Sequence, residues 1–275
     1  MIKTRYQNEL TLSATCRAGS RGQDVRRVQE WLSLAATQYP GVALNTAVDG
    51  VYGAATVLAV QNLQRALGKP TTGETDQALF ATLTAPLRNA YELTQSYRSL
   101  RTAVVQIAAN HLRHVPRELQ YNGQQNLGPW VRSYCNGYDG TDFKWCMGFV
   151  QSVLDQAAYT TGRRFTDLMP QSLSCDVVGT SAEQRKTLIR NAAIRQNPSL
   201  VQPGDVFLLR NTAASADWYH TGIITRVVGD CFETIEGNTD QGGSSNGIGV
   251  FARTRNFRKS VIDAVSISKL EALIS

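Results

Sequence analysis

The segment 218-WYHTGIITRVVGDCFETIEGN-238 predicts two antiparallel strands that meet at Gly229-Asp230. Glu236 and Asn238 have the same parity, so both side chains point to one face of their strand. The connecting loop decides whether His220 shares that face. A two-residue loop would pair His220 with Thr239 and put the carboxylate and the amide on the opposite face. A three-residue loop, or a bulge with the same effect, would pair His220 with Asn238 and leave Glu236 one diagonal away.

Helical patterns precede this strand pair, and strand-like segments dominate after about residue 200. This order predicts an α+β fold, with helices packed on an antiparallel sheet in the second half. We expect an amino-terminal three-helix module at residues 14–86, a helical linker at 87–99 and a second domain at 100–275. The linker is the first part of a helix predicted over 87–118.

The composition is that of a chain that can bury a hydrophobic core without disulfide bonds. The 275 residues are 42% hydrophobic, carry a net charge of +6 and include five cysteines. The odd count and the lack of a CxxC motif speak against a disulfide framework or a structural zinc site. A mildly basic chain favours an anionic polymer as partner, such as nucleic acid or cell wall, but no Lys/Arg run indicates a nucleic-acid tail. We expect neither a signal peptide nor a transmembrane helix.

Cys146 begins an apolar-periodic segment that predicts the first turn of a helix. The positive end of a helix favours a thiolate, although a free cysteine is also a common core residue. His220 could accept the thiol proton, and Glu236 or Asn238 could orient its ring. These are the parts of a cysteine-nucleophile site, with a structural histidine as the alternative. Three further cysteines are expected to tolerate alanine apart from packing losses: Cys135, Cys175 and Cys231.

A separate set of motifs lies in the first 80 residues. In order, they are Gly22-Gln23-Asp24-Val25, Asp49-Gly50-Val51-Tyr52-Gly53, Val60-Gln61-Asn62-Leu63-Gln64 and Thr72-Gly73-Glu74-Thr75-Asp76. Together they resemble the three-helix peptidoglycan-binding domains found on many cell-wall hydrolases. The resemblance implies peptidoglycan as a partner. The residues alone would equally allow a small helical bundle used for packing or dimerisation.

The second half resembles the CHAP domain, a family of cysteine, histidine-dependent amidohydrolases and peptidases of papain-like fold. The resemblance rests on the order of Trp145-Cys146-Met147-Gly148-Phe149-Val150, Pro203-Gly204-Asp205-Val206, His220-Thr221-Gly222-Ile223 and Glu236-Gly237-Asn238. It implies a papain-like domain in which Cys146 is the nucleophile. By the same resemblance, Glu236 orients His220 and Asn238 supports the site.

The two resemblances together imply a peptidoglycan hydrolase that cuts an amide bond in the stem peptide or at the sugar–peptide junction. Such an enzyme requires no metal or organic cofactor and involves neither nucleic acid nor membrane. Two alternatives stay open: a non-catalytic wall-binding or structural protein, and a cysteine peptidase that acts on proteins. Substrate contacts are expected at Trp145, Trp218, Asp49 and Tyr52.

The biological setting also has two candidates. A phage endolysin and a secreted antibacterial effector, the latter with a cognate immunity protein, would both act in the periplasm or wall of a bacterium. We expect the protein to be a monomer made in the cytoplasm without a signal peptide.

Overall fold

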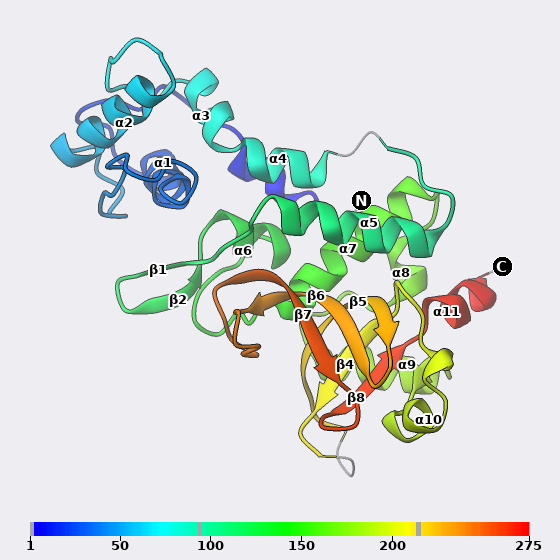
Figure 1. Cartoon of the computed structure of the whole chain (residues 1–275). Coiled ribbons are helices and arrows are strands. Elements are labelled where there is room, and N and C mark those ends of the chain that lie inside the picture. The colour runs from blue at the N-terminus through cyan, green and yellow to red at the C-terminus, as the bar shows by residue number, and fades with distance from the viewer. Residues whose placement is uncertain (1–2, 93–94, 213–215, 275) are drawn as a thin grey trace.

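The computed structural model in Figure 1 describes residues 3–92, 95–212 and 216–274. Its first elements are η1 (Arg5–Glu9), α1 (Gln23–Ala35), α2 (Ala54–Ala66), α3 (Gln77–Leu83), α4 (Ala85–Tyr91) and α5 (Leu100–Arg113). The middle of the chain forms β1 (Leu119–Tyr121), β2 (Gln124–Leu127), α6 (Pro129–Tyr134), α7 (Cys146–Thr160), α8 (Phe165–Leu168), α9 (Cys175–Gln184), β3 (Leu188–Ile189), α10 (Asn191–Gln196) and η2 (Pro198–Leu200). The last elements are β4 (Val206–Arg210), β5 (Trp218–Val228), β6 (Cys231–Thr239), β7 (Gly249–Asn256), β8 (Val261–Val265) and α11 (Ile267–Ile274).

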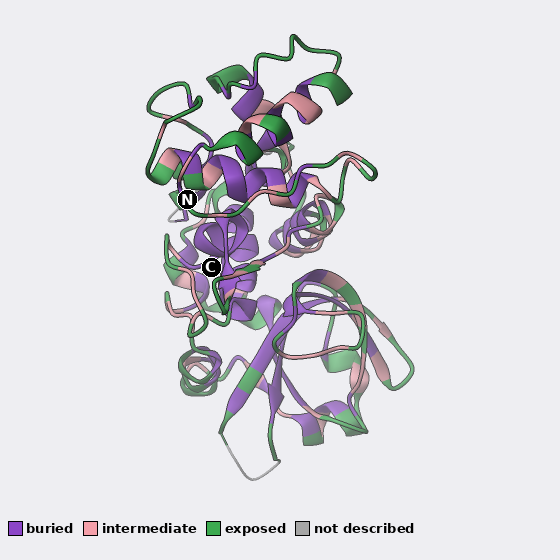
Figure 2. Cartoon of the chain, turned by 90° about the vertical axis from the view of Figure 1, so that its left-hand side faces the viewer, coloured by how far each residue is buried: buried purple, intermediate pink, exposed green. Residues whose placement is uncertain are grey.

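A six-stranded antiparallel sheet forms the centre of the second half, in the order β3-β8-β4-β5-β6-β7. Helices α5 and α7 pack against β5 and β6 (Figure 1). Buried residues gather in these central helices and on the strands, whereas the outlying helices keep exposed faces (Figure 2). Helices followed by an antiparallel sheet confirm the predicted α+β class. Within the described ranges, no helix has both the length and the apolar character to cross a membrane.

The hairpin of β5 and β6 combines a two-residue loop with a bulge. Val228 pairs with Cys231, so the loop is Gly229-Asp230. The register then shifts between Ile224 and Arg226, and beyond this shift Ile223 pairs with Ile235. The extra residue of the bulge restores the pairing that a three-residue loop would give. The face of β6 that carries Glu236 is thereby turned toward His220.

Gly222 makes room for this arrangement. Continued by one residue, the register sets Gly222 opposite Glu236. A Cβ atom at Gly222 would lie 2.8 Å from Cγ of Glu236 and 2.8 Å from the Ile235 carbonyl oxygen. Any side chain at this position would therefore push the carboxylate away from the histidine.

The predicted helix over 87–118 is interrupted. Helix α4 ends at Tyr91 and α5 begins at Leu100, with Gln95–Ser99 outside any helix. The backbone N–H of Thr102 donates to the Ser99 side-chain oxygen at 3.2 Å, which caps a new helix at this point. The prediction of a helical linker at 87–99 was therefore wrong for the described residues after Tyr91. The chain leaves the helix there, and the Ser99 cap starts a second one.

The amino-terminal module packs on the second half through a buried charge cluster. Arg132 of α6 donates to Glu9 at 2.8 Å and to Glu30 of α1 at 2.6 Å. The Tyr121 hydroxyl donates to Glu30 at 2.8 Å, and Asp139 accepts a further bond from Arg132 at 2.8 Å. Buried charges are costly without partners, so these contacts hold the elements that supply them together.

We predict that Arg132→Ala destabilises the whole chain. It would leave Glu9 and Glu30 buried without their cation, at a cost of about 3–5 kcal/mol in unfolding free energy. Chemical denaturation measures this cost. The matched control is Arg164→Ala, which removes an ion pair to Asp167 from a side chain that is 82% exposed, and it should change stability by less than about 0.5 kcal/mol. Equal stability of the two variants would show that the cluster does not hold the halves together.

Candidate active site

Cys146 is the first residue of α7, and its side chain faces β5 and β6. It is 3% exposed, and three polar partners of the same region, His220, Glu236 and Asn238, are fully buried. The helix start supplies backbone N–H groups and the positive end of the helix dipole. The sequence signal for a helix beginning at Cys146 is confirmed.

His220 and Glu236 form a buried pair. Nε2 of the His220 ring lies 2.8 Å from Oε2 of Glu236. The other ring nitrogen, Nδ1, has no hydrogen-bond partner among the described residues. Burial alone would lower the pKa of His220, but its interactions with the neighbouring Cys146 and with Glu236 overcome this and raise the pKa to about 9. The ring is thus held as an imidazolium.

Both carboxylate oxygens of Glu236 are saturated with hydrogen bonds. Arg255 of β7 donates from Nε to Oε1 at 2.8 Å and from Nη2 to Oε2. The Thr234 hydroxyl donates to Oε1 at 2.6 Å. Burial would raise the pKa of Glu236, but the bonds from Arg255 and His220 lower it to about 2. Glu236 is therefore an anion with a fixed orientation.

The Cys146 thiol is stabilised as a thiolate. The neighbouring Cys175 lowers its pKa most, burial opposes this, and the neighbouring His220 with its charge lowers the pKa again. The net result is a pKa well below the ordinary value of a thiol. A thiolate beside an imidazolium is the reactive form of a nucleophilic cysteine.

Asn238 forms no hydrogen bond to the His220 ring among the described residues, although the register sets the two positions opposite each other. Its backbone has φ of 55°, within the register shift between Glu236 and Thr239. The side-chain N–H donates to Asn246 at 3.4 Å, and Oδ1 is buried without a partner among the described residues. Glu236, and not Asn238, is the residue bonded to the His220 ring, and the supporting role expected for Asn238 stays a prediction.

Three of the four expected substrate contacts need correction, because their rings lie in the core. Trp145 is 0% exposed and donates to Glu118 at 3.0 Å, and Trp218 is 2% exposed and donates to Asp263 at 3.1 Å. Tyr52 is 1% exposed, and its hydroxyl donates to the Gly73 carbonyl at 2.9 Å. Large aromatic rings occur both in protein cores and at binding surfaces, and these three belong to the core.

Asp49, the fourth expected contact, is exposed. Its Oδ1 accepts hydrogen bonds from the Val51 backbone N–H and the Gln29 amide, both at 2.8 Å. These bonds lower the pKa of Asp49, the one from Val51 most. The carboxylate thus closes a turn, and ligand contact by Asp49 stays a prediction.

Two polar residues of the site were not predicted from the sequence. Arg255 donates to Glu236 from the neighbouring strand, and Cys175, the first residue of α9, contributes to the lowered pKa of Cys146. Arg253-Thr254-Arg255 is an alternating pattern that indicates two arginines on one face of a strand, but nothing in it specifies a carboxylate partner. Cys175 carries no sequence signal beyond its position before an apolar-periodic segment.

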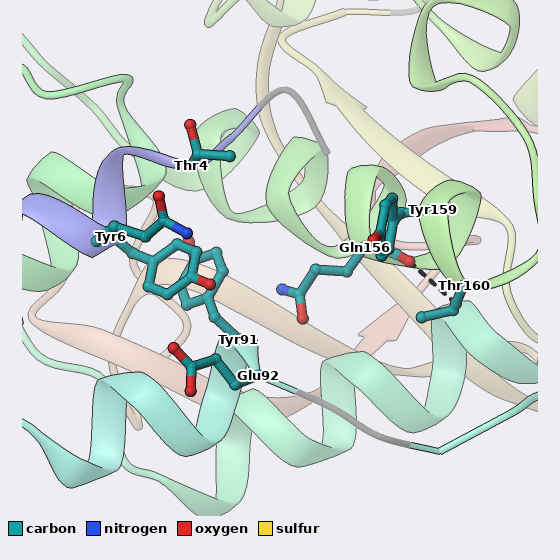
Figure 3. Close-up of a pocket in the computed structure, with 8 residues that line it drawn as sticks. Thr4, Tyr6, Tyr91, Glu92, Gln156, Tyr159 and Thr160 are labelled. Atoms are coloured by element: carbon teal, nitrogen blue, oxygen red, sulfur yellow. Dashed lines mark hydrogen bonds between the residues drawn. The ribbon is translucent and has the colours of Figure 1, made fainter.

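A separate hollow of about 330 Å³ lies at the far end of α7. Figure 3 shows its lining, with Tyr6 and Tyr91 stacked at 4.4 Å between ring centres and Gln156 facing them. Gln156 is ten residues along α7 from Cys146, or about 15 Å at the rise of an α-helix. This hollow is therefore not part of the thiol site.

Comparison with known proteins supports the peptidoglycan-binding resemblance of the amino-terminal module. The family model of the peptidoglycan binding domain matches residues 21–83. The chain therefore carries a peptidoglycan-binding domain, formed by α1, α2 and α3. No curated protein and no solved structure matches the chain significantly. The resemblance of the second half to CHAP domains stays a prediction.

We predict a specific pH dependence for the His220–Glu236 pair. The raised pKa of His220 adds stability below its unfolded value of about 6.5, and this is lost as pH rises through about 9. The lowered pKa of Glu236 adds stability above about 4.3, and this is lost as pH falls toward about 2. Both contributions are complete between these limits, at about pH 4.5–6.5.

Denaturation of wild type and His220→Gln across pH 6–9.5 checks this prediction. The stability difference should be on the order of 2–3 kcal/mol at pH 6 and shrink toward pH 9.5. His114→Gln is the control. Burial lowers the pKa of His114, so its effect on stability has the opposite sign, rising with pH around the unfolded value of about 6.5 and becoming constant above about pH 7.5. A difference between wild type and His220→Gln that does not change with pH would refute the raised pKa.

Proposed function

We propose that the chain is a peptidoglycan hydrolase that cleaves an amide bond with Cys146 as nucleophile. The observation that carries the proposal is a buried cysteine at a helix start whose pKa is lowered by His220, which in turn is hydrogen-bonded to the Glu236 carboxylate. The peptidoglycan-binding domain at residues 21–83 supports the substrate class. The candidate bonds are those of the stem peptide and the sugar–peptide junction.

The proposed reaction proceeds through an acyl-enzyme. The thiolate of Cys146 attacks the amide carbonyl carbon, and the new C–S bond places negative charge on the carbonyl oxygen. The backbone N–H of Cys146, at the helix start, stabilises that oxyanion. The imidazolium of His220 protonates the departing amine as the C–N bond breaks.

Water then completes the cycle. Neutral His220 takes a proton from the attacking water, the C–S bond breaks, and a carboxylic acid leaves while the thiolate returns. Glu236 stays ionised throughout and stabilises the imidazolium, in the manner of the third member of a catalytic triad. No step requires a metal or an organic cofactor.

The charge pattern of the site favours this enzyme over a purely wall-binding or structural protein. A protein that only binds has no use for a buried thiolate–imidazolium pair, since buried charges cost free energy. The peptidoglycan-binding domain favours cell wall over protein substrates. Both a phage endolysin and an antibacterial effector fit this chemistry, and a neighbouring gene for a small inhibitor would indicate the effector and its immunity protein.

We predict that Cys146→Ala abolishes hydrolysis, because it removes the proposed nucleophile. Purified sacculi are digested and the products analysed by mass spectrometry. Activity should fall below about a hundredth of wild type. The control is Cys231→Ala, at the far end of the β5–β6 hairpin, which should keep activity.

The products also identify the bond. Peptide-free glycan would indicate an amidase, and shortened stem peptides would indicate an endopeptidase. Undiminished digestion by Cys146→Ala would refute the nucleophile. Intact sacculi but cleaved test proteins would support the protein-peptidase alternative.

Wall binding is predicted to be separable from catalysis. The full-length Cys146→Ala chain should sediment with purified sacculi, and soluble wall fragments should compete it off. The full chain is the suitable form, because removal of the module would unpair Arg132. Recovery of the inactive chain in the supernatant, without sacculus binding, would contradict peptidoglycan as its partner.

A further inference from the structure

Strand β7, at the edge of the sheet, presents two arginines to the face of β6 that carries Glu236. The register pairs Arg253 with Thr234 and Arg255 with Phe232. Residues two apart on a strand point to the same side, so both arginines share the face of the carboxylate. Of the two, Arg255 is the one that binds it.

Arg255 binds Glu236 through two parallel hydrogen bonds. Its Nε donates to Oε1 at 2.8 Å, and its Nη2 donates to Oε2. The Glu236 side chain is fully buried, and that of Arg255 is 15% exposed. A bidentate pair of this kind fixes the plane of the carboxylate as well as its distance. Oε2 is also the oxygen that lies 2.8 Å from Nε2 of His220, so Arg255 sets the place of the atom that meets the imidazole.

The guanidinium of Arg255 is itself held by the loop between β6 and β7. Its Nη1 donates to the Gly243 carbonyl at 3.1 Å. The turn that presents this carbonyl is closed by the Ser244 backbone N–H, which donates to Asp240 at 3.1 Å. Nε, Nη1 and Nη2 of Arg255 therefore all have acceptors, and the side chain is fixed at both its loop end and its carboxylate end.

Arg253 contacts the same loop without binding the carboxylate. Its Nη1 donates to the Gln241 carbonyl, and its Nε has no partner among the described residues. A Cβ atom at Gly243 would lie 3.0 Å from Nη2 of Arg253 and 3.4 Å from Nη1 of Arg255. The two arginines thus share the loop and differ in their contact with Glu236, which makes Arg253 a matched control.

We propose that Arg255 is a positioning residue that keeps the Glu236 carboxylate an oriented anion against the His220 ring. Its value for catalysis rests on the proposed function, whereas its contact with the carboxylate does not. A lysine would supply the charge but not the two parallel donors. A neutral side chain would leave Glu236 with His220 and the Thr234 hydroxyl as its partners.

The ionisable groups that act on this ion pair or on its partners come from every side: His220 and Tyr219 on β5, Arg253 on β7, Asp240 in the loop and Cys146 on α7. Burial would raise the pKa of Glu236, and Arg255 contributes most to lowering it to about 2. Without Arg255, burial would be opposed chiefly by His220. Since a neighbouring opposite charge lowers a carboxyl pKa by about 1–3 units, its loss should raise the pKa of Glu236 by a similar amount.

The experiment follows the Glu236 carboxyl carbon by NMR in the isotope-labelled full-length chain, without any wall substrate. The signal is the one that disappears in Glu236→Gln. From pH 7 down to about pH 2.5, wild type should keep this group ionised. Arg255→Met should bring its midpoint into the range, about 1–3 pH units higher. Arg255→Lys should show a smaller rise, and Arg253→Met should behave as wild type.

A Glu236 midpoint in Arg255→Met that equals that of wild type overturns the proposal. So does an equal rise in Arg253→Met, because loss of a loop contact would then be the cause. Arg255→Lys keeps the charge and serves alone if the methionine variant does not fold. A lysine variant identical to wild type would show that two parallel donors are not needed, and it would overturn the proposal as well.

Digestion of soluble wall fragments supplies the second readout. Arg255 does not touch substrate in this proposal, so Arg255→Met should lower kcat and leave KM nearly unchanged, with a larger loss at pH 5 than at pH 7. Arg255→Lys should recover part of kcat. A loss carried by KM instead would overturn the positioning role. A raised Glu236 midpoint in a chain whose wild type digests no wall substrate would refute only the hydrolase.

Discussion

The register between β5 and β6 is the constraint on which the candidate site depends. Side chains alternate across a strand, so a shift of one residue would turn Glu236 away from His220. The two-residue loop at Gly229-Asp230 would by itself impose the wrong face, and the shift between Ile224 and Arg226 corrects it. One extra residue in this bulge therefore decides which side chains of β6 face His220, although the bulge lies about ten residues before Glu236 in the sequence. Bulges commonly re-aim side chains in this way beside functional sites.

In this register the buried ionised side chains alternate in sign, because an isolated buried charge would be costly. Arg255, Glu236, His220 and Cys146 form a sequence of cation, anion, cation and anion, drawn from β7, β6, β5 and α7. Each ion stabilises its neighbours in a region where an isolated charge would be too costly to keep. Arg255 also donates to the Gly243 carbonyl at 3.1 Å, which links the carboxylate to the loop after β6. A substitution at any member therefore changes the protonation of the next.

Sequence reasoning reached the local parts of this site and missed the long-range ones. The helix start at Cys146 and the strands around His220 and Glu236 follow from periodicity and turn residues, and parity placed Glu236 within reach of the ring. Arg255 and Cys175 come from elements whose packing no local pattern specifies. The aromatic rings of Trp145 and Trp218 could equally have been binding surfaces or core, and only the fold shows that they are core. The Ser99 cap was a local signal, but helical periodicity on both sides obscured it.

The buried cluster around Arg132 connects the peptidoglycan-binding domain to the proposed nucleophile. Glu30 of α1 binds Arg132 of α6, and Tyr134 at the end of α6 stacks on Trp145 at 5.5 Å between ring centres. Trp145 directly precedes Cys146 and forms the N-terminal boundary of α7. The module is therefore packed against α6, which in turn packs against α7, the helix that begins with Cys146. In the proposed hydrolase, a wall strand held by this module would reach Cys146 from a packed domain, and positioning of this kind lowers the entropic part of a reaction barrier.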